Sequence, residues 1–420
     1  MSRFRSLRFR FAALCLLAVL VTTATLLTVM HTQVRQLVED TTSVLIQSAE
    51  SETAKVTRDV YTMCQVVHEG LLNQVDTNLR VERHQLEQLG GVSFDRAEVA
   101  WTALEQGTRA EVALRLPKMM IGGKWLGQNS EPTVPTPWVD EVQKALGGTV
   151  TVFQRMNERG DMLRVATTVV DSGGKRAIGT YLAAQGTDGE ANPVIAAILS
   201  GNSYRGRAFV VNDWYITGYE PLLDSANRVI GMLYAGVKQE IPLRSGRKAI
   251  TSIVVGKTGY VWAVGGKGDK KGHYFVSLNG ARDGEDVHEM KDAEGNLVIQ
   301  QLIAQGLATR NGSINYQRYQ WLNPGEKAPR QKLAAVTYVE PWDWVIGAGT
   351  YEDDFTTTLQ RVTDVVASIT RWSLVSALMI LLAVVAAMMI VLRRLAKPLD
   401  QLVHASEAVA SGDLTQSLDV

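Results

Sequence analysis

Two long runs of mostly apolar, uncharged residues dominate the pattern of the chain, at residues 11–30 and 372–392. About 20 such residues cross the ~30 Å hydrocarbon layer of a bilayer as a helix. The alternative for the first run is a cleaved signal peptide. The run is long for that role, however, and no clear small-x-small cleavage site ends it. The pattern therefore predicts two transmembrane helices.

Residues 34–89, which follow the first run, form a second regular pattern. This stretch has no proline and only one glycine, Gly70. Apolar residues recur in steps of three and four, which is typical of an amphipathic helix: Val56, Val60, Met63, Val67 and Leu71. We expect one long helix, or two in series. The apolar stripe could pack on the helix's own domain or form a dimer seam, and the pattern leaves both open.

Between Gly91 and the second apolar run, short apolar segments alternate with turn residues. Asn192-Pro193 supplies a cap and a first-turn proline for a short helix that Gly201 can end, and residues 296–307 form a second helical pattern. Strands are expected at 163–170, 208–211, 214–219, 229–234, 260–264, 273–277, 313–321, 332–338 and 344–350, with a turn at 224–227. These elements predict an α+β fold with antiparallel sheets.

A weak internal repeat suggests two similar modules. Tyr219-Glu220-Pro221 followed by Val-Ile-Gly at 229–231 resembles Tyr338-Val339-Glu340-Pro341 followed by Val-Ile-Gly at 345–347. Each copy is expected to form the closing strand pair of its module. Residues 353–368 then continue as a helix toward the second membrane span.

Charge sets the expected topology. Four arginines precede the first span, and Arg393, Arg394 and Lys397 follow the second, so both flanks are expected in the cytoplasm and the middle outside. The 420 residues carry 43 basic and 43 acidic side chains, which gives no argument for nucleic-acid binding. The two cysteines, Cys15 and Cys64, lie in different settings, and we expect no disulfide between them.

No catalytic constellation is present, and the six histidines lack metal-ligand spacing, so we expect neither enzymatic activity nor a metal. The informative cluster is basic and aromatic, because an arginine fork suits a carboxylate and aromatic walls exclude water. The expected ligand-binding residues are Arg164, Arg176, Arg207, Tyr181, Tyr215 and Tyr219, with Arg205 and Trp214 nearby. Arginines paired with Asp or Glu are the alternative. The secondary candidates are Tyr260, Trp262, Lys332 and Tyr338, with Tyr274 and Tyr316 beside them.

After the second span, Pro398 can start a helix whose seam is Leu395, Leu399, Leu402 and Val409, followed by Gly412-Asp413-Leu414. This stretch resembles the first helix and connector of a HAMP linker, the relay of bacterial receptors. The sequence stops at Val420, before a second HAMP helix. We therefore expect either a fragment or an incomplete receptor.

In this context the middle of the chain resembles a double Cache domain, the Cache 3–Cache 2 fusion of methyl-accepting chemotaxis proteins. The matching stretches are VFQRM at 152–156, GDMLRVAT at 160–167, KRAIGTY at 175–181, residues 201–211 and 214–237, GYVW at 259–262 and residues 338–351. The resemblance implies two PAS-like modules, a homodimer and a small extracellular ligand, bound in the membrane-distal module, with no cofactor.

The expected organisation is a cytoplasmic tail (1–10), a first span (11–30), a long periplasmic helix (31–90), a membrane-distal Cache module (91–240), a membrane-proximal Cache module (241–355), a connecting helix (356–371), a second span (372–392) and a partial HAMP linker (393–420). We expect an inner-membrane chemoreceptor for an organic anion or amino acid, acting on cytoplasmic signalling proteins through an output domain beyond residue 420. The alternatives are the sensor half of a histidine kinase or nucleotide cyclase, and a truncated binding protein that only captures ligand.

Overall fold

The computed structural model describes residues 2–186 and 189–410. They divide into two units: Glu52–Thr350, which holds both sheets, and the described residues on either side of it. The helices are α1 (Ser2–Gln88), α2 (Val139–Leu146), α3 (Pro193–Leu199), α4 (Glu240–Thr251), α5 (Val298–Leu307) and α6 (Asp353–Ala410).

The two outermost helices contain the predicted membrane spans. Within α1 and α6, the stretches of high hydropathy are long and apolar enough to cross a membrane, and none of their residues is buried inside the protein. The first span and the long amphipathic helix are one continuous helix, α1. Of the predicted relay, Gly412, Asp413 and Leu414 lie outside the described residues, and the HAMP linker stays a prediction.

The first sheet has nine strands in the order β3-β2-β1-β6-β5-β4-β9-β8-β7. All pairs are antiparallel except β1 with β6. The strands are β1 (Val92–Glu105), β2 (Glu111–Ile121), β3 (Lys124–Trp125), β4 (Thr149–Arg155), β5 (Met162–Thr167), β6 (Thr180–Leu182), β7 (Tyr204–Val210), β8 (Asp213–Leu223) and β9 (Val229–Lys238).

The second sheet has the order β10-β11-β15-β14-β13, with β12 paired to β11. Its strands are β10 (Val254–Val255), β11 (Gly259–Gly265), β12 (Tyr274–Val276), β13 (Asn315–Trp321), β14 (Arg330–Val339) and β15 (Trp344–Tyr351). The α+β fold with antiparallel sheets is therefore confirmed. The internal repeat falls on neighbouring strands in both sheets, β8 with β9 and β14 with β15. The division into modules at residue 240 stays a prediction.

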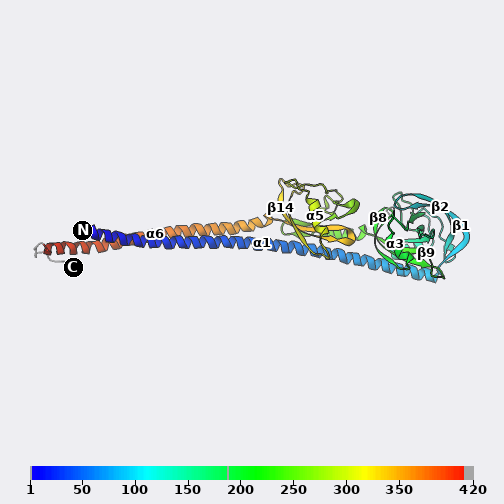
Figure 1. The fold of residues 1–420 in the computed structure, drawn as a ribbon, viewed down its shortest axis with the longest axis horizontal. Coiled ribbons are helices and arrows are strands. Elements are labelled where there is room, and N and C mark those ends of the chain that lie inside the picture. The colour runs from blue at the N-terminus through cyan, green and yellow to red at the C-terminus, as the bar shows by residue number, and fades with distance from the viewer. Residues whose placement is uncertain (1, 187–188, 411–420) are drawn as a thin grey trace. The chain divides into compact units, whose positions relative to one another are not determined.

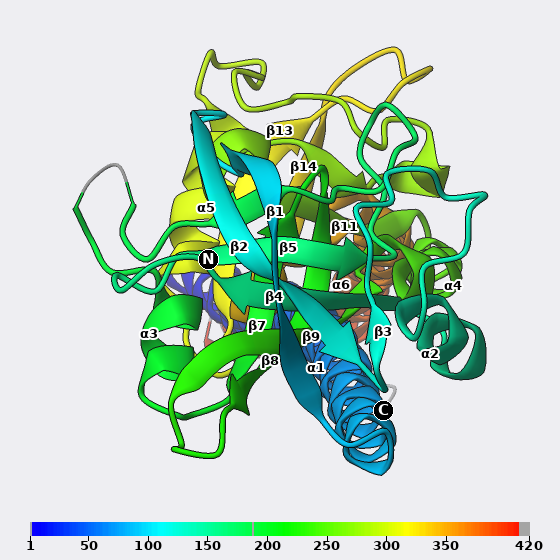
Figure 2. The ribbon, with the colours of Figure 1, turned by 90° about the vertical axis from the view of Figure 1, so that its right-hand side faces the viewer.

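The short helix α3 begins where the sequence predicts it. Asn192 caps it, because its side-chain oxygen accepts hydrogen bonds from the backbone N–H groups of Val194 (3.0 Å) and Ile195 (3.4 Å). Gly201 follows the helix with a φ of +75°, a conformation that favours glycine. Figure 2 shows α3 and α1 on opposite sides of β7, β8 and β9.

From residue 52 onward, α1 runs alongside both sheets (Figure 1), and its side chains contribute to the hydrophobic cores of both. Val60 and Cys64 are buried against the second sheet, and Val75 and Leu79 against the first. Of the two uses considered for the apolar stripe, the structure shows packing on the helix's own domain. A dimer seam stays a prediction, because three residues of the stripe are only partly buried: Val56, Met63 and Val67.

Candidate functional site

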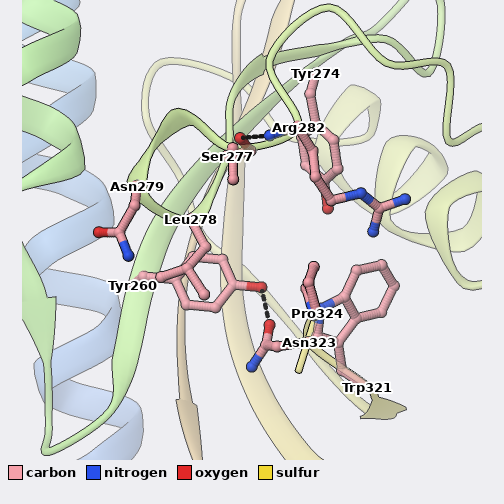
Figure 3. A pocket seen from close by; sticks show the side chains of 10 residues that line it. Tyr260, Tyr274, Ser277, Leu278, Asn279, Arg282, Trp321, Asn323 and Pro324 are labelled. Atoms are coloured by element: carbon pink, nitrogen blue, oxygen red, sulfur yellow. Dashed lines mark hydrogen bonds between the residues drawn. The ribbon is translucent and has the colours of Figure 1, made fainter. Parts of the chain in front are cut away.

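A cavity of ≈160 Å³ opens on the second sheet, among residues of β11, of β12 and of the end of β13. Its wall combines aromatic rings, amide and hydroxyl groups and one charged side chain. The lining residues are Tyr260, Tyr274, Ser277, Leu278, Asn279, Ala281, Arg282, Trp321, Asn323 and Pro324. Figure 3 shows Tyr260 on one side of this space and Tyr274 with Arg282 on the other.

Strand ends and a tight turn position these groups. Tyr260 comes from β11 and Trp321 from the end of β13, and Asn323 follows two residues later. The Tyr260 hydroxyl donates a 3.0 Å hydrogen bond to the Asn323 side-chain oxygen, as drawn in Figure 3. This bond fixes the Tyr260 ring and turns the amide group of Asn323 toward it.

The turn after β12 carries the charged residue. Asp283 Oδ1 accepts hydrogen bonds from the N–H of Ser277 (2.8 Å) and from its hydroxyl (2.7 Å), and Ser277 Oγ accepts from the N–H of Arg282 (2.9 Å). The turn thereby holds Arg282 at the cavity. Its guanidinium donates to Glu285 and lies 5.8 Å from the centre of the Tyr274 ring. The hydrogen bond to Glu285 raises the pKa of Arg282, so it carries a positive charge.

Lys332 packs against the ring of Tyr260 and is buried, with 1% of its surface exposed. Its Nζ is 3.5 Å from the centre of the Tyr260 ring, a cation–π geometry. The side chain reaches the ring from β14 by crossing β15 at Gly349, which pairs with Tyr260. A methyl group at residue 349 would lie 2.5 Å from Lys332 Cε, so the crossing depends on glycine. Burial lowers the pKa of Lys332 well below its usual value.

Two of the secondary candidates lie elsewhere in the sheet. The indole of Trp262 covers Gly347 on the neighbouring strand and is 3% exposed. The Tyr338 hydroxyl donates to Asp343 Oδ1 at 2.9 Å. Of the four secondary candidates only Tyr260 lines the cavity, and Lys332 contacts the ring of Tyr260.

The first sheet encloses Arg164 in an aromatic cluster. Its guanidinium lies 5.0 Å from the Phe153 ring centre and donates to Thr180 and Gln106, and it is 2% exposed. Among the described residues Nε has no hydrogen-bond partner. Burial lowers the pKa of Arg164, and Tyr219, Tyr234 and Tyr215 are the groups near enough to oppose that effect. The structure thus brings Arg164, Tyr215 and Tyr219 together.

The other two predicted arginines lie apart from this cluster. Arg176 donates to both carboxylate oxygens of Asp140 (2.8 and 2.9 Å) and to the carbonyl of Thr167, and is 6% exposed. Arg207 is half-buried, stacks 3.7 Å from the Trp214 ring centre and donates to Gln239. Both guanidinium groups are thus held by the protein itself, and a ligand contact for either stays a prediction.

Tyr181 lines a separate groove of ≈590 Å³ between α3 and the segment after β6. Asp161, Ile195 and Leu199 are its other principal walls. Asp161 is only 6% exposed and accepts hydrogen bonds from Asn157 (2.7 Å) and from the N–H of Ala184 (2.8 Å). The carboxylate of Asp161 in this groove is therefore already hydrogen-bonded to other parts of the protein.

The sequence reasoning missed Arg282, Asn323 and Trp321. Arg282 adjoins an acidic stretch that looks like a solvated surface, and only the folded turn shows that it faces a cavity. Trp321 and Asn323 had a usable signal, because Trp321 ends the predicted strand 313–321 and Asn323 follows it by two residues, near strands that carry the secondary candidates. Among the described residues, no group of three or more His, Cys, Asp or Glu side chains is placed to hold a metal ion.

Comparison with known proteins settles the family. The sequence profile of the Cache 3/Cache 2 fusion domain matches residues 39–365, which is most of the chain. The chain belongs to this family. With the two long apolar helices on either side of the matched region, it is a membrane protein with an extracellular Cache sensor.

Two curated relatives match shorter stretches of this Cache protein. The methyl-accepting chemotaxis protein McpP of Pseudomonas putida is 32% identical over 140 residues, 33% of this chain and 24% of McpP. The sensor histidine kinase MctS of Rhizobium johnstonii is 31% identical over 120 residues, 29% of this chain and 24% of MctS. Each match thus spans about a quarter of the relative's length.

Solved structures give weaker similarity. The sensory domain of the Campylobacter jejuni chemoreceptor Tlp3 with isoleucine bound has a TM-score of 0.37 and 11% identity, covering 76% of this chain and 98% of that one. A methyl-accepting chemotaxis protein from Vibrio parahaemolyticus has a TM-score of 0.23 and 24% identity, covering 27% and 71%. The family assignment rests on the profile match.

Proposed function

We propose that the chain is the sensing part of a transmembrane chemoreceptor for a small carboxylate, bound in the cavity of the second sheet. The observation that carries the proposal is the charge of the wall: Arg282 is the one charged side chain among the ten that line the cavity. A guanidinium beside aromatic rings favours a carboxylate, and no lining carboxylate is available for a ligand's ammonium group.

The size of the cavity narrows the ligand further. An apolar protein cavity of about 150 Å³ holds a six-carbon ring, so ≈160 Å³ suits a ligand of roughly six non-hydrogen atoms. Lactate and alanine both have about that size and differ only in a hydroxyl against an ammonium group. The proposal therefore expects lactate to bind more tightly than alanine.

Calorimetry on the full chain in lipid nanodiscs tests this expectation. Arg282→Ala should weaken lactate binding by roughly tenfold to a hundredfold, because a charge-assisted hydrogen bond contributes about 1.5–3 kcal/mol. Arg282→Lys should also weaken it, because a point charge does not reproduce the planar fork. Arg96→Ala, at an exposed position of β1, is the matched control. Equal affinity for lactate and alanine, or unchanged binding in Arg282→Ala, would contradict the proposal.

A second candidate site for the same ligand class surrounds Arg164, with Tyr215 and Tyr219 beside it. The other expected contacts lie apart from this cluster, and a ligand contact for each stays a separate prediction: Arg176, Arg207 and Tyr181. The observation in favour of the second site is the buried Arg164 guanidinium, whose hydrogen bonds go to the neutral side chains of Thr180 and Gln106 and whose Nε has no partner among the described residues. Such a charge is costly unless an anion joins it. Loss of binding in Arg164→Ala, with Arg282→Ala unaffected, would move the site to the first sheet.

We further propose where the receptor lies in the cell and which partners it acts on. Basic residues flank both spans, which favours an inner-membrane protein with both ends in the cytoplasm. We propose a homodimer that acts on cytoplasmic signalling proteins. The similarity to a sensor histidine kinase keeps an enzymatic output as the alternative. The reading frame after residue 420 distinguishes the two outputs.

A further inference from the structure

Close packing joins α1 to β8 in the first sheet. A methyl group at Gly218 would lie 2.6 Å from the side chains of Leu79 and Val75, so the helix lies directly on the strand. Glu220 is two residues further along β8 and faces the same side, because alternate residues of a strand share a face. One helical turn beyond Leu79, α1 presents Glu82 at this contact.

Glu82 is a buried carboxyl group, and neither of its oxygens has a hydrogen-bond partner in the part of the chain that the structure describes. Its exposed fraction is 0%. Leu79 and Leu86, buried on either side along the helix, are apolar, and Asn78, buried one turn before Glu82, makes no hydrogen bond to its carboxyl group. An ionised carboxylate in such a place is strongly unfavourable, and the group keeps its proton instead. Burial raises the pKa of Glu82 well above its usual value, and the charge of Glu220 adds to the effect.

The charged groups around Glu82 come from three elements and already balance one another. Glu220 on β8 accepts hydrogen bonds from Arg83 on α1 (2.8 Å) and Arg205 on β7 (2.9 Å). Arg205 also pairs with Asp76 on α1. Two arginines thus meet two carboxylates, which leaves no surplus positive charge to stabilise a third carboxylate. Ionised Glu82 would face Glu220 uncompensated.

We propose that Glu82 is a proton-sensing group that gives the receptor a second input, external pH, independent of the ligand. When Glu82 is protonated, α1 packs on β8. When it loses its proton, the buried charge and the repulsion from Glu220 loosen this contact. Because α1 is the same helix that contains the first membrane span, the change acts on an element of the signal path.

Hydrogen–deuterium exchange of the full chain in nanodiscs tests the proposal. The pH should run from about 6 to about 9, since buried glutamates can titrate as high as ~8–9. After correction for intrinsic exchange, residues 75–86 and β8 should lose protection as pH rises. Between the ordinary pKa of a glutamate and the raised pKa of Glu82, the opening equilibrium should increase about tenfold per pH unit, and above the raised pKa it should level off. Glu82→Gln, which mimics the protonated group, should abolish the pH dependence. Glu87→Gln, exposed on the same helix, should retain it.

The same pH dependence in wild type and Glu82→Gln would overturn the proposal, as would its absence in wild type. If Glu82→Gln does not fold, infrared spectroscopy of the wild-type chain gives an independent readout. A carbonyl band of a protonated carboxyl should be present at neutral pH and disappear at alkaline pH, in parallel with the loss of protection. A spectrum without that band at neutral pH would show Glu82 ionised and the proposal wrong.

Discussion

The position of Lys332 depends on a residue that has no side chain. Gly349 leaves room on β15 for the lysine to cross to Tyr260, and an added methyl would lie 2.5 Å from Lys332 Cε. We expect Gly349→Ala to lower the free energy of unfolding by about 1–3 kcal/mol, the usual cost of overpacking a core. Thermal denaturation of the full chain in nanodiscs measures this change.

Gly246→Ala is the matched control for that substitution. Gly246 lies within α4, and no atom stands within 4 Å of the position that a methyl would take. Because alanine is a better helix former than glycine, the control should be neutral or stabilising by up to about 1 kcal/mol. Equal melting temperatures for Gly349→Ala and wild type would show that Lys332 does not need this passage.

Cys64 should be chemically inert in the folded protein. It is 2% exposed, and burial raises the pKa of its thiol to about 12. Since the thiolate is the reactive form, labelling with maleimide at neutral pH should be slow until the protein is denatured. The measurement uses a Cys15→Ala background. A cysteine introduced at Val66, which is 62% exposed on the same helix, should react at once. Rapid labelling of Cys64, or an oxidised dimer linked through it, would contradict its burial.

At the scale of elements, a single hydroxyl links α1 to the centre of the second sheet. Thr57 Oγ1 lies 3.0 Å from the carbonyl oxygen of Ala335 on β14 and accepts a 3.2 Å hydrogen bond from the N–H of Ala348 on β15. Thr57→Val keeps the shape but leaves both backbone groups without this partner, so it should destabilise the protein by about 1–3 kcal/mol.

Thr57→Ser distinguishes the contribution of the hydroxyl's hydrogen bonds from the contribution of the side chain's packing. Serine retains the hydrogen bonds and loses one methyl group, which should cost only about 0.8 kcal/mol. Comparison of the two melting temperatures tests the link. If serine is more damaging than valine, packing rather than hydrogen bonding joins α1 to the strands.

The elements that could be predicted from the sequence are those in which the order of apolar and polar residues follows the buried and exposed positions. Alternating or continuous apolar runs marked β9, β11 and β15, and the cap at Asn192 marked α3. The hairpin β1–β2 was missed because most of β1 is exposed, and no buried face imposes an alternation on its sequence.

The site was predictable only in part, for a related reason. Aromatic and basic residues within strands identified Tyr260 and Lys332 as candidates. The position of Arg282 at the cavity is set by a turn in which Asp283 accepts hydrogen bonds from the N–H and the hydroxyl of Ser277. The periodicity of the sequence does not predict that turn. Asn323 likewise gains its place from a hydrogen bond with Tyr260, which is 63 residues away in sequence.

At the scale of the whole molecule, the topology can be tested by labelling intact cells. In a background without Cys15 and Cys64, an impermeant maleimide should modify a cysteine placed at Ser172, which is exposed in the first-sheet region. It should not modify one placed at Ser411, which lies outside the described residues but next to the basic flank of the second span. Labelling at position 411 in intact cells would reverse the proposed orientation.

The shared helix also has a thermodynamic consequence. Because residues 52–88 of α1 supply side chains to both hydrophobic cores, neither sheet can lose that wall without exposing apolar surface in the other. The Glu52–Thr350 unit should therefore melt as one cooperative block, with a single calorimetric peak whose van't Hoff enthalpy equals the measured enthalpy. Two separated peaks would mean that the sheets unfold independently. If the block is cooperative, global unfolding of one sheet carries the other sheet with it, whereas local opening of a single contact remains possible.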